Sequence, residues 1–140
     1  MVRSAKIGFL MDTLANMFSQ IKNAQAVGKE VVELPHSQFK EAVARLLEKE
    51  GYLVKVKTFK PQEKGFKMLS LKLKYFKDDP FITHLKKISK PGQRIYLPVD
   101  DIPRVLGGRG LVVVSTSQGV MSSKDARNKN LGGEILCEVW

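Results

Sequence analysis

The sequence predicts an α+β fold, in which an N-terminal α-β-α-β-β unit packs against a C-terminal unit of short antiparallel strands with short helices. Apolar residues recur at helical spacing over 14–21 and 39–47, and they alternate with polar residues over 54–58 and 69–75. After Asp78-Asp79-Pro80 the apolar runs are short and separated by glycine and proline, which is typical of small antiparallel sheets. We expect an N-terminal arm over 1–11, an N-terminal unit over 12–78 and a C-terminal unit over 79–140.

The first helix is predicted to begin at Asp12, a good N-cap residue, and to end near Gly28. Leu14, Met17, Phe18 and Ile21 form its apolar stripe. A short strand over 30–34 follows, with Val32 and Leu34 turned to the core. Ser37 is expected to cap a second helix, whose apolar residues are Phe39, Val43, Leu46 and Leu47.

Two strands with a lysine face follow this helix. Val54, Val56 and Thr58 share one face of the first strand, and Leu69, Leu71, Leu73 and Tyr75 share one face of the second. Eight lysines and one acid, Glu63, lie between Lys55 and Lys77. The lysines suit a phosphate-contacting stripe, and they equally suit protection of an exposed sheet edge; the two readings are compatible.

The C-terminal unit is predicted from shorter signals. Residues 82–88 fit neither period clearly, and Lys90-Pro91-Gly92 is a turn before a strand over 93–97, which places Arg94 and Tyr96 on one side. We expect a short helix capped by Asp100 and Asp101, entered by Pro103 and ended by Gly107-Gly108. A strand over 111–116, a helix over 124–130 capped by Ser122 or Ser123, and a last strand over 134–140 complete the unit.

Composition favours a polyanionic partner. The chain has 24 Lys and Arg against 14 Asp and Glu, a net charge of +10, which favours nucleic acid first and an anionic membrane surface second. Cys137 stands alone, so we expect no disulfide within the chain, no cysteine metal site and a reducing, cytoplasmic setting. Residues 7–11 are too short an apolar run for a signal peptide or a membrane span. Arg3, Ser4 and Lys6 resemble an organelle transit peptide only faintly, and a basic tail is the favoured interpretation.

The sequence offers no convincing catalytic group, cofactor site or metal site. Ser115 and Ser117 lack the Gly-x-Ser-x-Gly setting of a nucleophile. His36 is interpreted as a surface turn residue and His84 as a solvated one, with a phosphate contact as the alternative for His84. Residues 107–110 lack the Gly-Lys-Ser/Thr ending of a phosphate loop.

RNA binding explains the polar residues better. Ser115-Thr116-Ser117-Gln118-Gly119 follows a buried strand, and hydroxyls, an amide and backbone N–H groups suit the mixed donors and acceptors of irregular RNA. Tyr96 fits base or sugar stacking, although a core tyrosine is the alternative. Glu134 is unexpected at an RNA surface, and we expect it to orient loop amides or a basic side chain.

These residues also resemble a known family, small-subunit ribosomal protein eight of bacterial type (the universal S8 family). The resemblance covers nearly the whole chain after residue 11, more loosely over Asp12 to Ala24 and Leu47 to Tyr52. The resemblance rests on five sequence motifs and the last residue: Lys90-Pro91-Gly92-Gln93-Arg94-Ile95-Tyr96, Ile102-Pro103-Arg104-Val105-Leu106-Gly107-Gly108, Ser115-Thr116-Ser117-Gln118-Gly119-Val120-Met121, Asp125-Ala126-Arg127, Gly132-Gly133-Glu134-Ile135-Leu136-Cys137, and the terminal Trp140.

The resemblance implies a structural component of the small ribosomal subunit that binds the central domain of small-subunit ribosomal RNA and is needed for assembly. Neighbouring small-subunit proteins are implied partners, and bacterial members also repress their own operon by binding its messenger RNA. A cytoplasmic ribosome is expected, with an organellar ribosome as the alternative. The candidate RNA-binding residues are Ser115, Thr116, Ser117, Gln118, Gly119, Glu134, Tyr96, Arg94, Lys90, Gly133, Asp12, Thr13, Asn23 and Lys57.

Departures from the family pattern concern the N-terminal contacts. The family commonly begins its first helix with Asp-Pro, whereas this chain has Asp12-Thr13; Asn16 replaces an acid and Gln20 an arginine. The segment before Asp12 is longer than usual, and the loop 59–67 is peculiar to this chain. Two rival functions remain: a small RNA-processing enzyme that uses the hydroxyl loop, and a protein-interaction module.

Overall fold

The computed structural model describes residues 2–63 and 65–140, with side chains over 14–63, 65–105 and 107–140. The elements are mixed helices and antiparallel strands, which confirms the α+β prediction. Contacts divide the chain into two compact units, 13–81 and 82–140, and group residues 1–12 with the second. The domain limits predicted from sequence, after residues 11 and 78, stay predictions.

The first helix is longer than predicted. Helix α1 spans Val2–Ala26, so the predicted helix start at Asp12 is wrong. Proline is absent before Asp12 and helix-forming residues such as Ala5, Leu10 and Met11 are present, so nothing local stops the helix, and Asp12 is left inside it. The predicted apolar stripe is confirmed, because Leu14, Met17, Phe18 and Ile21 are buried.

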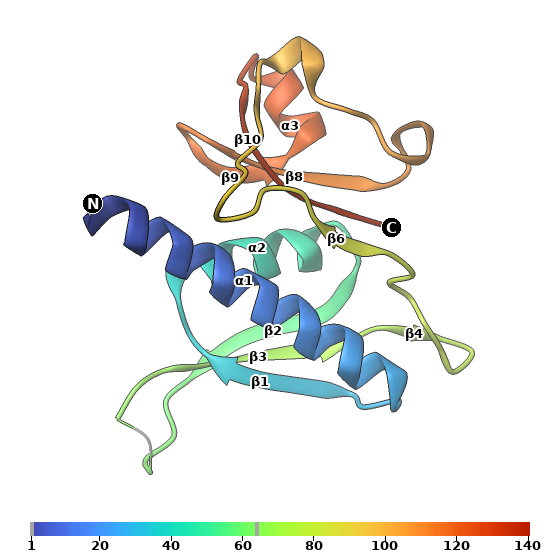
Figure 1. Ribbon diagram of the computed structural model, residues 1–140. Coiled ribbons are helices and arrows are strands. Elements are labelled where there is room, and N and C mark those ends of the chain that lie inside the picture. Colours follow the sequence, from blue (N-terminus) through green and yellow to red (C-terminus); the bar gives the residue numbers. More distant parts are fainter. Residues whose placement is uncertain (1, 64) are drawn as a thin grey trace. The chain divides into compact units, whose positions relative to one another are not determined.

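In the N-terminal unit, the part of α1 from Thr13 onward and helix α2 (Gln38–Lys49) lie on one face of a three-stranded antiparallel sheet (Figure 1). The sheet order is β1-β3-β2, with β1 at Val31–Pro35, β2 at Leu53–Phe59 and β3 at Met68–Leu73. Both the α2 cap and the core residues of β1 match the predictions. Ser37 Oγ accepts the Lys40 N–H at 3.1 Å, and Val32 and Leu34 are buried.

The alternation predicted for β2 fails at its start. The register with β3 shifts between Leu53 and Lys55, which marks a bulge. Leu53 and Val56 are therefore buried, whereas Val54, expected in the core, is exposed. One extra residue in a strand reverses the faces of the residues before it, so period-two counting fails at a bulge.

The second half of the predicted hairpin ends early. Strand β3 stops at Leu73, and Tyr75 begins a separate two-stranded ribbon of β4 (Tyr75–Phe76) and β5 (Asp79–Pro80). Its turn residues Lys77 and Asp78 have φ of 51° and 67°, the left-handed values that tight hairpin turns require. Asp78 thus lies in the turn and Asp79 in β5, both within the first compact unit.

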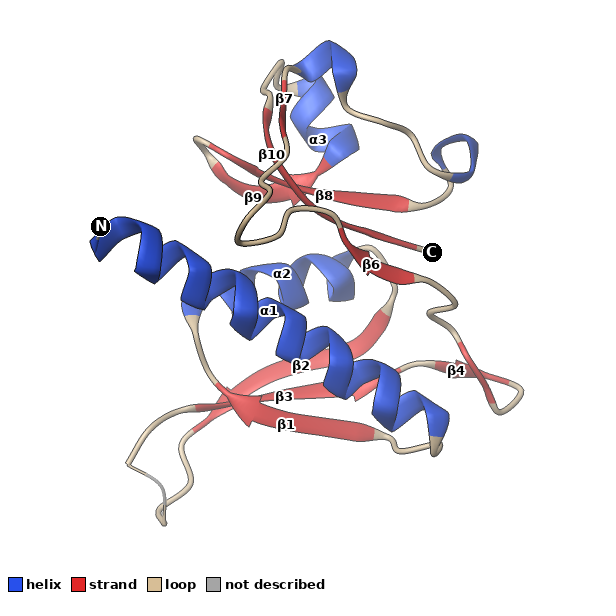
Figure 2. Ribbon diagram, viewed as in Figure 1, coloured by secondary structure: helices blue, strands red, loops and turns tan. Residues whose placement is uncertain are grey.

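The C-terminal unit is an antiparallel sheet of order β6-β10-β8-β9, with β7 also paired to β10 (Figure 2). The strands are β6 Leu85–Lys87, β7 Tyr96–Leu97, β8 Leu111–Thr116, β9 Gly119–Ser122 and β10 Gly133–Val139. Helix α3 (Ser123–Asn128) is capped by Ser122, whose Oγ accepts the Asp125 N–H at 3.1 Å. The core of the C-terminal unit includes Val112, Val114, Ala126 and Ile135.

The helix predicted after Asp100 does not form. Two 3-10 turns stand there instead, Val99–Asp101 and Leu106–Gly108, and Pro103 lies between them. Gly107 and Gly108 have φ of 63° and 93°, which right-handed helix excludes. Proline contributes no N–H and the glycines take left-handed conformations, so the segment stays a loop.

Candidate functional site

The hydroxyl segment forms the tip of the β8–β9 hairpin. Thr116 pairs with Gly119, so only Ser117 and Gln118 lie in the turn. Thr116 Oγ1 donates to the Gly119 carbonyl oxygen at 2.9 Å and accepts the Gln118 N–H at 3.1 Å. Thr116 is therefore occupied in holding the turn, while Ser117 and Gln118 are exposed to an external partner.

Glu134 lies between two other predicted site residues. It pairs with Ser115 of β8 on one side and with Tyr96 of β7 on the other. Directly opposed residues of neighbouring strands project on the same face, with their Cβ atoms roughly 5 Å apart. The sheet register thus brings three residues that are widely separated in the sequence, Tyr96, Glu134 and Ser115, into one row across neighbouring strands.

The carboxylate of Glu134 is poorly satisfied. Its Oε2 is buried and has no hydrogen-bond partner within the described part of the chain. Burial raises the pKa of Glu134 above its ordinary value, and the Arg94 guanidinium offsets part of this rise. A desolvated acceptor at the rim of an exposed row is chemically suited to an incoming N–H or O–H donor.

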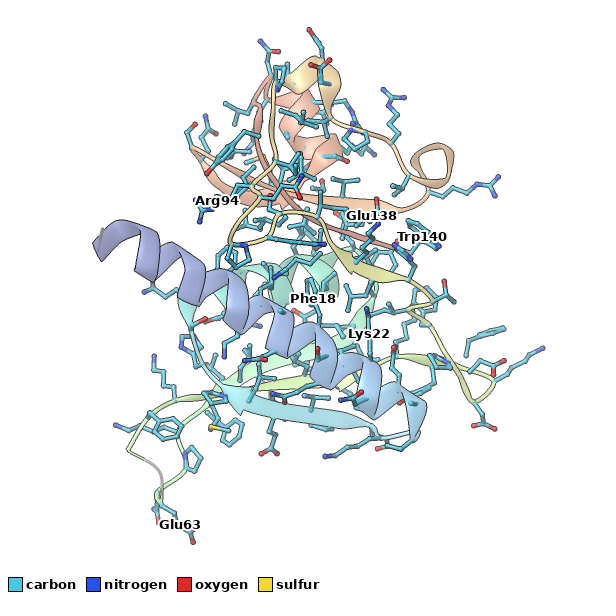
Figure 3. All side chains as sticks on the ribbon, viewed as in Figure 1. Phe18, Lys22, Glu63, Arg94, Glu138 and Trp140 are labelled. Carbon is cyan, nitrogen blue, oxygen red and sulfur yellow. The ribbon has the colours of Figure 1, made fainter. Side chains whose placement is uncertain are left out.

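Tyr96 forms the exposed end of this row, and the half-buried Arg94 lies beside it. Arg94 Nη1 donates to the Tyr96 hydroxyl oxygen at 3.1 Å, in agreement with the prediction that both lie on one side. The Tyr96 side chain is 60% exposed, which excludes the alternative of a core tyrosine. Figure 3 labels Arg94 at the surface of the C-terminal unit. An aromatic ring fixed at its hydroxyl end and open on its face can stack on a base.

Lys90 stands in a tight turn that a buried serine anchors. Lys90 and Gln93 exchange backbone hydrogen bonds, each of 3.0 Å, and the Lys90 side chain is exposed. Ser89 is fully buried, and its Oγ accepts the Ile95 N–H at 3.0 Å. Ser89 is not among the residues predicted from sequence, although a serine directly before a Lys-Pro-Gly turn is the local signal for such a side-chain-to-backbone bond.

Gly133 is required by close packing rather than by an unusual dihedral angle. A Cβ atom added there would lie 2.2 Å from the Ser115 carbonyl oxygen. Strands β8 and β10 therefore approach closely at the base of the hairpin that carries Ser117. Gly133 shapes the site through its backbone, and it offers no side chain to a ligand.

The remaining predicted residues are not brought together with this row by any described contact. Asn23 and Lys57 are exposed residues of the N-terminal unit, on α1 and β2. Asp12 and Thr13 lie inside α1, and their side chains fall outside the described part of the structure. Their inclusion in an RNA site stays a prediction.

The two histidines are tied to carboxylates, so the predicted surface positions need correction. His84 stacks on Trp140 with a centroid distance of 3.7 Å and lies 3.2 Å from a Glu138 oxygen; Figure 3 labels both of these partners. His36 Nε2 lies 2.6 Å from a Glu41 oxygen. Both histidines are partly buried, because strand and helix pairing brings an acid beside each one.

Three further findings bear on the chemistry. The side chains that the structure describes include no group of three or more His, Cys, Asp or Glu that could hold a metal ion. Cys137 is buried and unpaired, and burial raises its pKa far above the ordinary thiol value. Among the described residues, no helix has the length and apolarity needed to cross a bilayer.

Comparison with known proteins identifies the family. Residues 12–140 match the family model described as ribosomal protein S8. Proteins named small ribosomal subunit protein uS8 are 45% identical in Oleidesulfovibrio alaskensis, covering 94% of this chain and 99% of the relative, and 45% identical in Vibrio vulnificus, covering 93% and 98%. The protein named small ribosomal subunit protein uS8c of Angiopteris evecta is 43% identical, covering 92% and 98%. These matches extend over nearly the whole chain, and the chain therefore belongs to the ribosomal protein S8 family.

Proposed function

We infer that this protein is a non-catalytic component of the small ribosomal subunit. Its proposed role is to bind the central domain of small-subunit ribosomal RNA and to support subunit assembly there. The names of the relatives support the assignment to the small subunit, and the strongly basic composition supports an RNA partner. Neighbouring small-subunit proteins are further proposed partners, in a cytoplasmic ribosome or an organellar one.

The observation that carries this proposal is the row Tyr96, Glu134 and Ser115 beside the exposed Ser117 turn. Irregular RNA presents unstacked bases and 2′-hydroxyls that both donate and accept. In the proposed complex the Ser117 hydroxyl and turn amides meet such groups, Glu134 accepts an N–H or O–H, and Tyr96 stacks. Arg94 and Lys90 neutralise nearby phosphates, and Gly119 and Gly133 permit the close backbone approach.

A second RNA partner is proposed from the family resemblance. Bacterial members repress their own operon by binding a messenger RNA structure similar to the ribosomal site. The same row would serve both RNAs, since they would present the same groups. A leader RNA of this protein's operon should then compete with the ribosomal helix for one site, and simultaneous binding of both would exclude shared use.

The decisive test compares cognate and unrelated RNA. The wild-type protein should bind an isolated central-domain helix with sub-micromolar affinity. Ser117→Ala should weaken that binding by about tenfold, a hydrogen-bond contribution of about 1.4 kcal/mol, and should barely alter binding to an unrelated duplex. Filter binding or fluorescence anisotropy at fixed salt would measure both. Equal losses on the two RNAs would mean that the turn does not read the specific site.

The rival functions make different demands. A processing enzyme would convert labelled RNA under the same conditions, whereas a protein-interaction module would show no salt-dependent RNA binding. Cosedimentation with small subunits, released only at high salt, is expected for the proposed role.

A further inference from the structure

Strand β1 has an outer edge whose backbone groups are unpaired. The Glu30 carbonyl accepts the Leu73 N–H at 2.8 Å, and the His36 N–H donates to the Lys67 carbonyl at 3.1 Å. Antiparallel pairing alternates, so even-numbered residues of β1 bond to β3, and the N–H and C=O groups of Val31 and Glu33 point away from it. Within the described residues, no strand pairs with that side of β1.

At the opposite edge of the same sheet, helix side chains occupy backbone groups of the edge strand. On β2, the Val56 N–H donates to Glu48 Oε2 at 2.9 Å, and Arg45 Nη1 donates to the Val56 carbonyl at 2.7 Å. Both partners come from α2, so helix side chains block this edge at its centre. Free edges invite pairing with another chain and are usually covered. The fold closes one edge of the sheet and leaves the other open.

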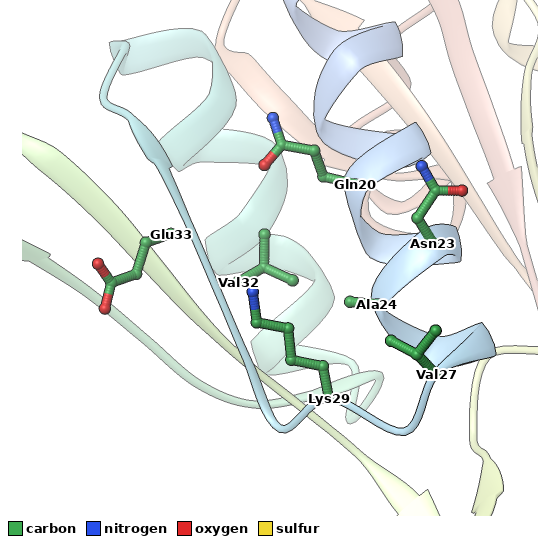
Figure 4. A pocket seen from close by; sticks show the side chains of 7 residues that line it. All are labelled: Gln20, Asn23, Ala24, Val27, Lys29, Val32 and Glu33. Atoms are coloured by element: carbon green, nitrogen blue, oxygen red, sulfur yellow. The ribbon is translucent and has the colours of Figure 1, made fainter.

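The open edge borders two adjoining hollows. One, of about 380 Å³, lies between the last turns of α1 and the start of β1; Figure 4 shows the side chains that line it. Ala24 and Val32 supply buried apolar surface there, and Val27 is 79% exposed. The other, of about 470 Å³, follows the edge itself at Lys29, Glu30, Val31 and Glu33.

The start of the edge is fixed before any partner arrives. Gly28, with a φ of 72°, ends α1, and the Lys29 N–H donates to the Ala24 carbonyl at 2.9 Å. The Tyr75 hydroxyl then donates to the Lys29 carbonyl at 2.6 Å. A preorganised edge loses little entropy when another strand adds to it.

The charges at the edge discriminate among occupants. Glu30 and Glu33 are exposed acids in a chain of net charge +10, and they outnumber Lys29, the exposed base that lines the same edge. Their carboxylates would repel RNA phosphates. A second copy of this chain paired on β1 would place acids against acids and add its own positive charge. A basic extended segment would instead complement both acids.

We propose that the β1 edge binds a basic, extended segment of a partner protein by strand addition. The N–H and C=O groups of Val31 and Glu33 supply the backbone bonds. Alternate side chains of the segment face opposite ways, so apolar ones enter the hollow over Ala24, Val27 and Val32, and basic ones lie beside Glu33. Pro35 has no N–H, which limits the pairing to the first part of the strand.

Amide exchange of the full-length, isotope-labelled protein tests the proposal directly. The probe is a short synthetic peptide of alternating lysine and valine. Binding should slow hydrogen exchange at the Val31 and Glu33 amides and leave Val32 and Leu34 unchanged, because those are already bonded to β3. The peptide N-methylated on the amides that face β1 should lose binding, and the peptide methylated on its other edge should keep it. Binding without protection of Val31 and Glu33 would overturn the proposal.

Charge variants give a second, independent result. Glu30→Gln with Glu33→Gln should weaken peptide binding roughly three- to tenfold at low salt, as expected for two exposed ion pairs. Glu50→Gln, an exposed acid at the end of α2, is the matched control and should have no effect. An unchanged affinity in the double variant would count against a basic occupant.

The alternative occupant, RNA, has its own signature. If the central-domain helix protects the Val31 and Glu33 amides, the edge belongs to RNA and the proposal is wrong. Ser117→Ala should lose RNA affinity and keep peptide binding. Failure at the β1 edge is therefore distinguishable from failure of the proposed RNA function.

Discussion

At the scale of single residues, the site includes features that disfavour stability. Glu134 keeps a buried oxygen without a hydrogen-bond partner among the residues that the structure describes, and a buried unpaired polar atom costs about 1–3 kcal/mol. Gly133 beside it has no side chain, because the Ser115 carbonyl fills the space. A carboxylate that the fold leaves unsatisfied is best explained by a ligand that satisfies it, as functional sites often are locally destabilising.

Replacing Glu134 should separate stability from binding. Because burial raises its pKa in the folded protein, folding favours the protonated form. The penalty is absent below the ordinary value of 4.5, grows as pH rises through it, and levels off above the folded pKa. Glu134→Gln should therefore be more stable than wild type at neutral pH, by at most about 1–3 kcal/mol.

Urea unfolding across pH 4 to 8 would measure the difference, which should vanish at the acid end. The same variant should bind the cognate RNA helix more weakly at neutral pH, because an acceptor is lost. A variant less stable than wild type at neutral pH would show that Glu134 is satisfied in the folded protein.

Gly133→Ala should destabilise the C-terminal unit. The new Cβ would lie 2.2 Å from a backbone oxygen, so β8 and β10 must separate, at a cost of about 1–3 kcal/mol or more. Gly92→Ala is the matched control, since nothing lies within 4 Å of its added Cβ, and it should change stability by less than about 0.5 kcal/mol. Equal stability of the two variants would contradict the close approach.

At the scale of elements, helix caps and strand registers decide where the interacting side chains lie. The Ser37 cap fixes the start of α2, and α2 in turn supplies Arg45 and Glu48 to the edge of β2. In the other unit, β10 carries Glu134 between β7 and β8. A helix cap thus positions the side chains that cover one sheet edge, and a strand register positions Glu134 between Tyr96 and Ser115.

Ser37→Ala should destabilise the N-terminal unit by about 1 kcal/mol, the usual cost of losing a serine N-cap. Ser19→Ala, on the exposed side of α1, is the comparison and should stay within about 0.5 kcal/mol of wild type. Denaturant unfolding followed by far-ultraviolet circular dichroism would report both changes. RNA binding should be unaffected by either substitution at temperatures where the protein is folded.

At the scale of the whole molecule, charge acts at long range and shape acts locally. The net charge of +10 attracts any nucleic acid. The N-terminal sheet carries part of this positive charge on its lysines. Lys55 on β2 and Lys72 on β3 are directly opposed in the strand pairing. Like charges directly opposed are unfavourable in a free protein, and a phosphate chain would relieve them. Lys57 belongs to the same exposed set.

Lys57→Ala should lower affinity for cognate and unrelated RNA about equally. Each lost phosphate contact reduces the slope of log K against log salt by about 0.7 to 0.9. Ser117→Ala should leave that slope unchanged while lowering cognate affinity. Binding isotherms at several salt concentrations would measure the slopes, and an unaltered slope in Lys57→Ala would assign that lysine to edge protection alone.

The sequence by itself determined the local elements whose signals are short in range. Helical periods located the buried stripes of the two helices of the N-terminal unit, and Ser37 predicted the start of α2 because serine is a favoured N-cap residue. The residues of the hydroxyl turn were also predictable, because a buried strand followed by small polar residues has one local interpretation. Local signals failed where competing local preferences were nearly equal, as at Asp12, and where the β2 bulge changed the counting.

Only the tertiary structure decided which distant residues meet. The positions of Tyr96, Glu134 and Ser115 in one row follow from strand register, and register depends on packing of the whole sheet rather than on any one segment. The open edge of β1 is likewise invisible in the sequence, because an edge is defined by the strand that is absent beside it. The sequence specifies which chemical groups are present, and long-range contacts between strands assemble those groups into surfaces.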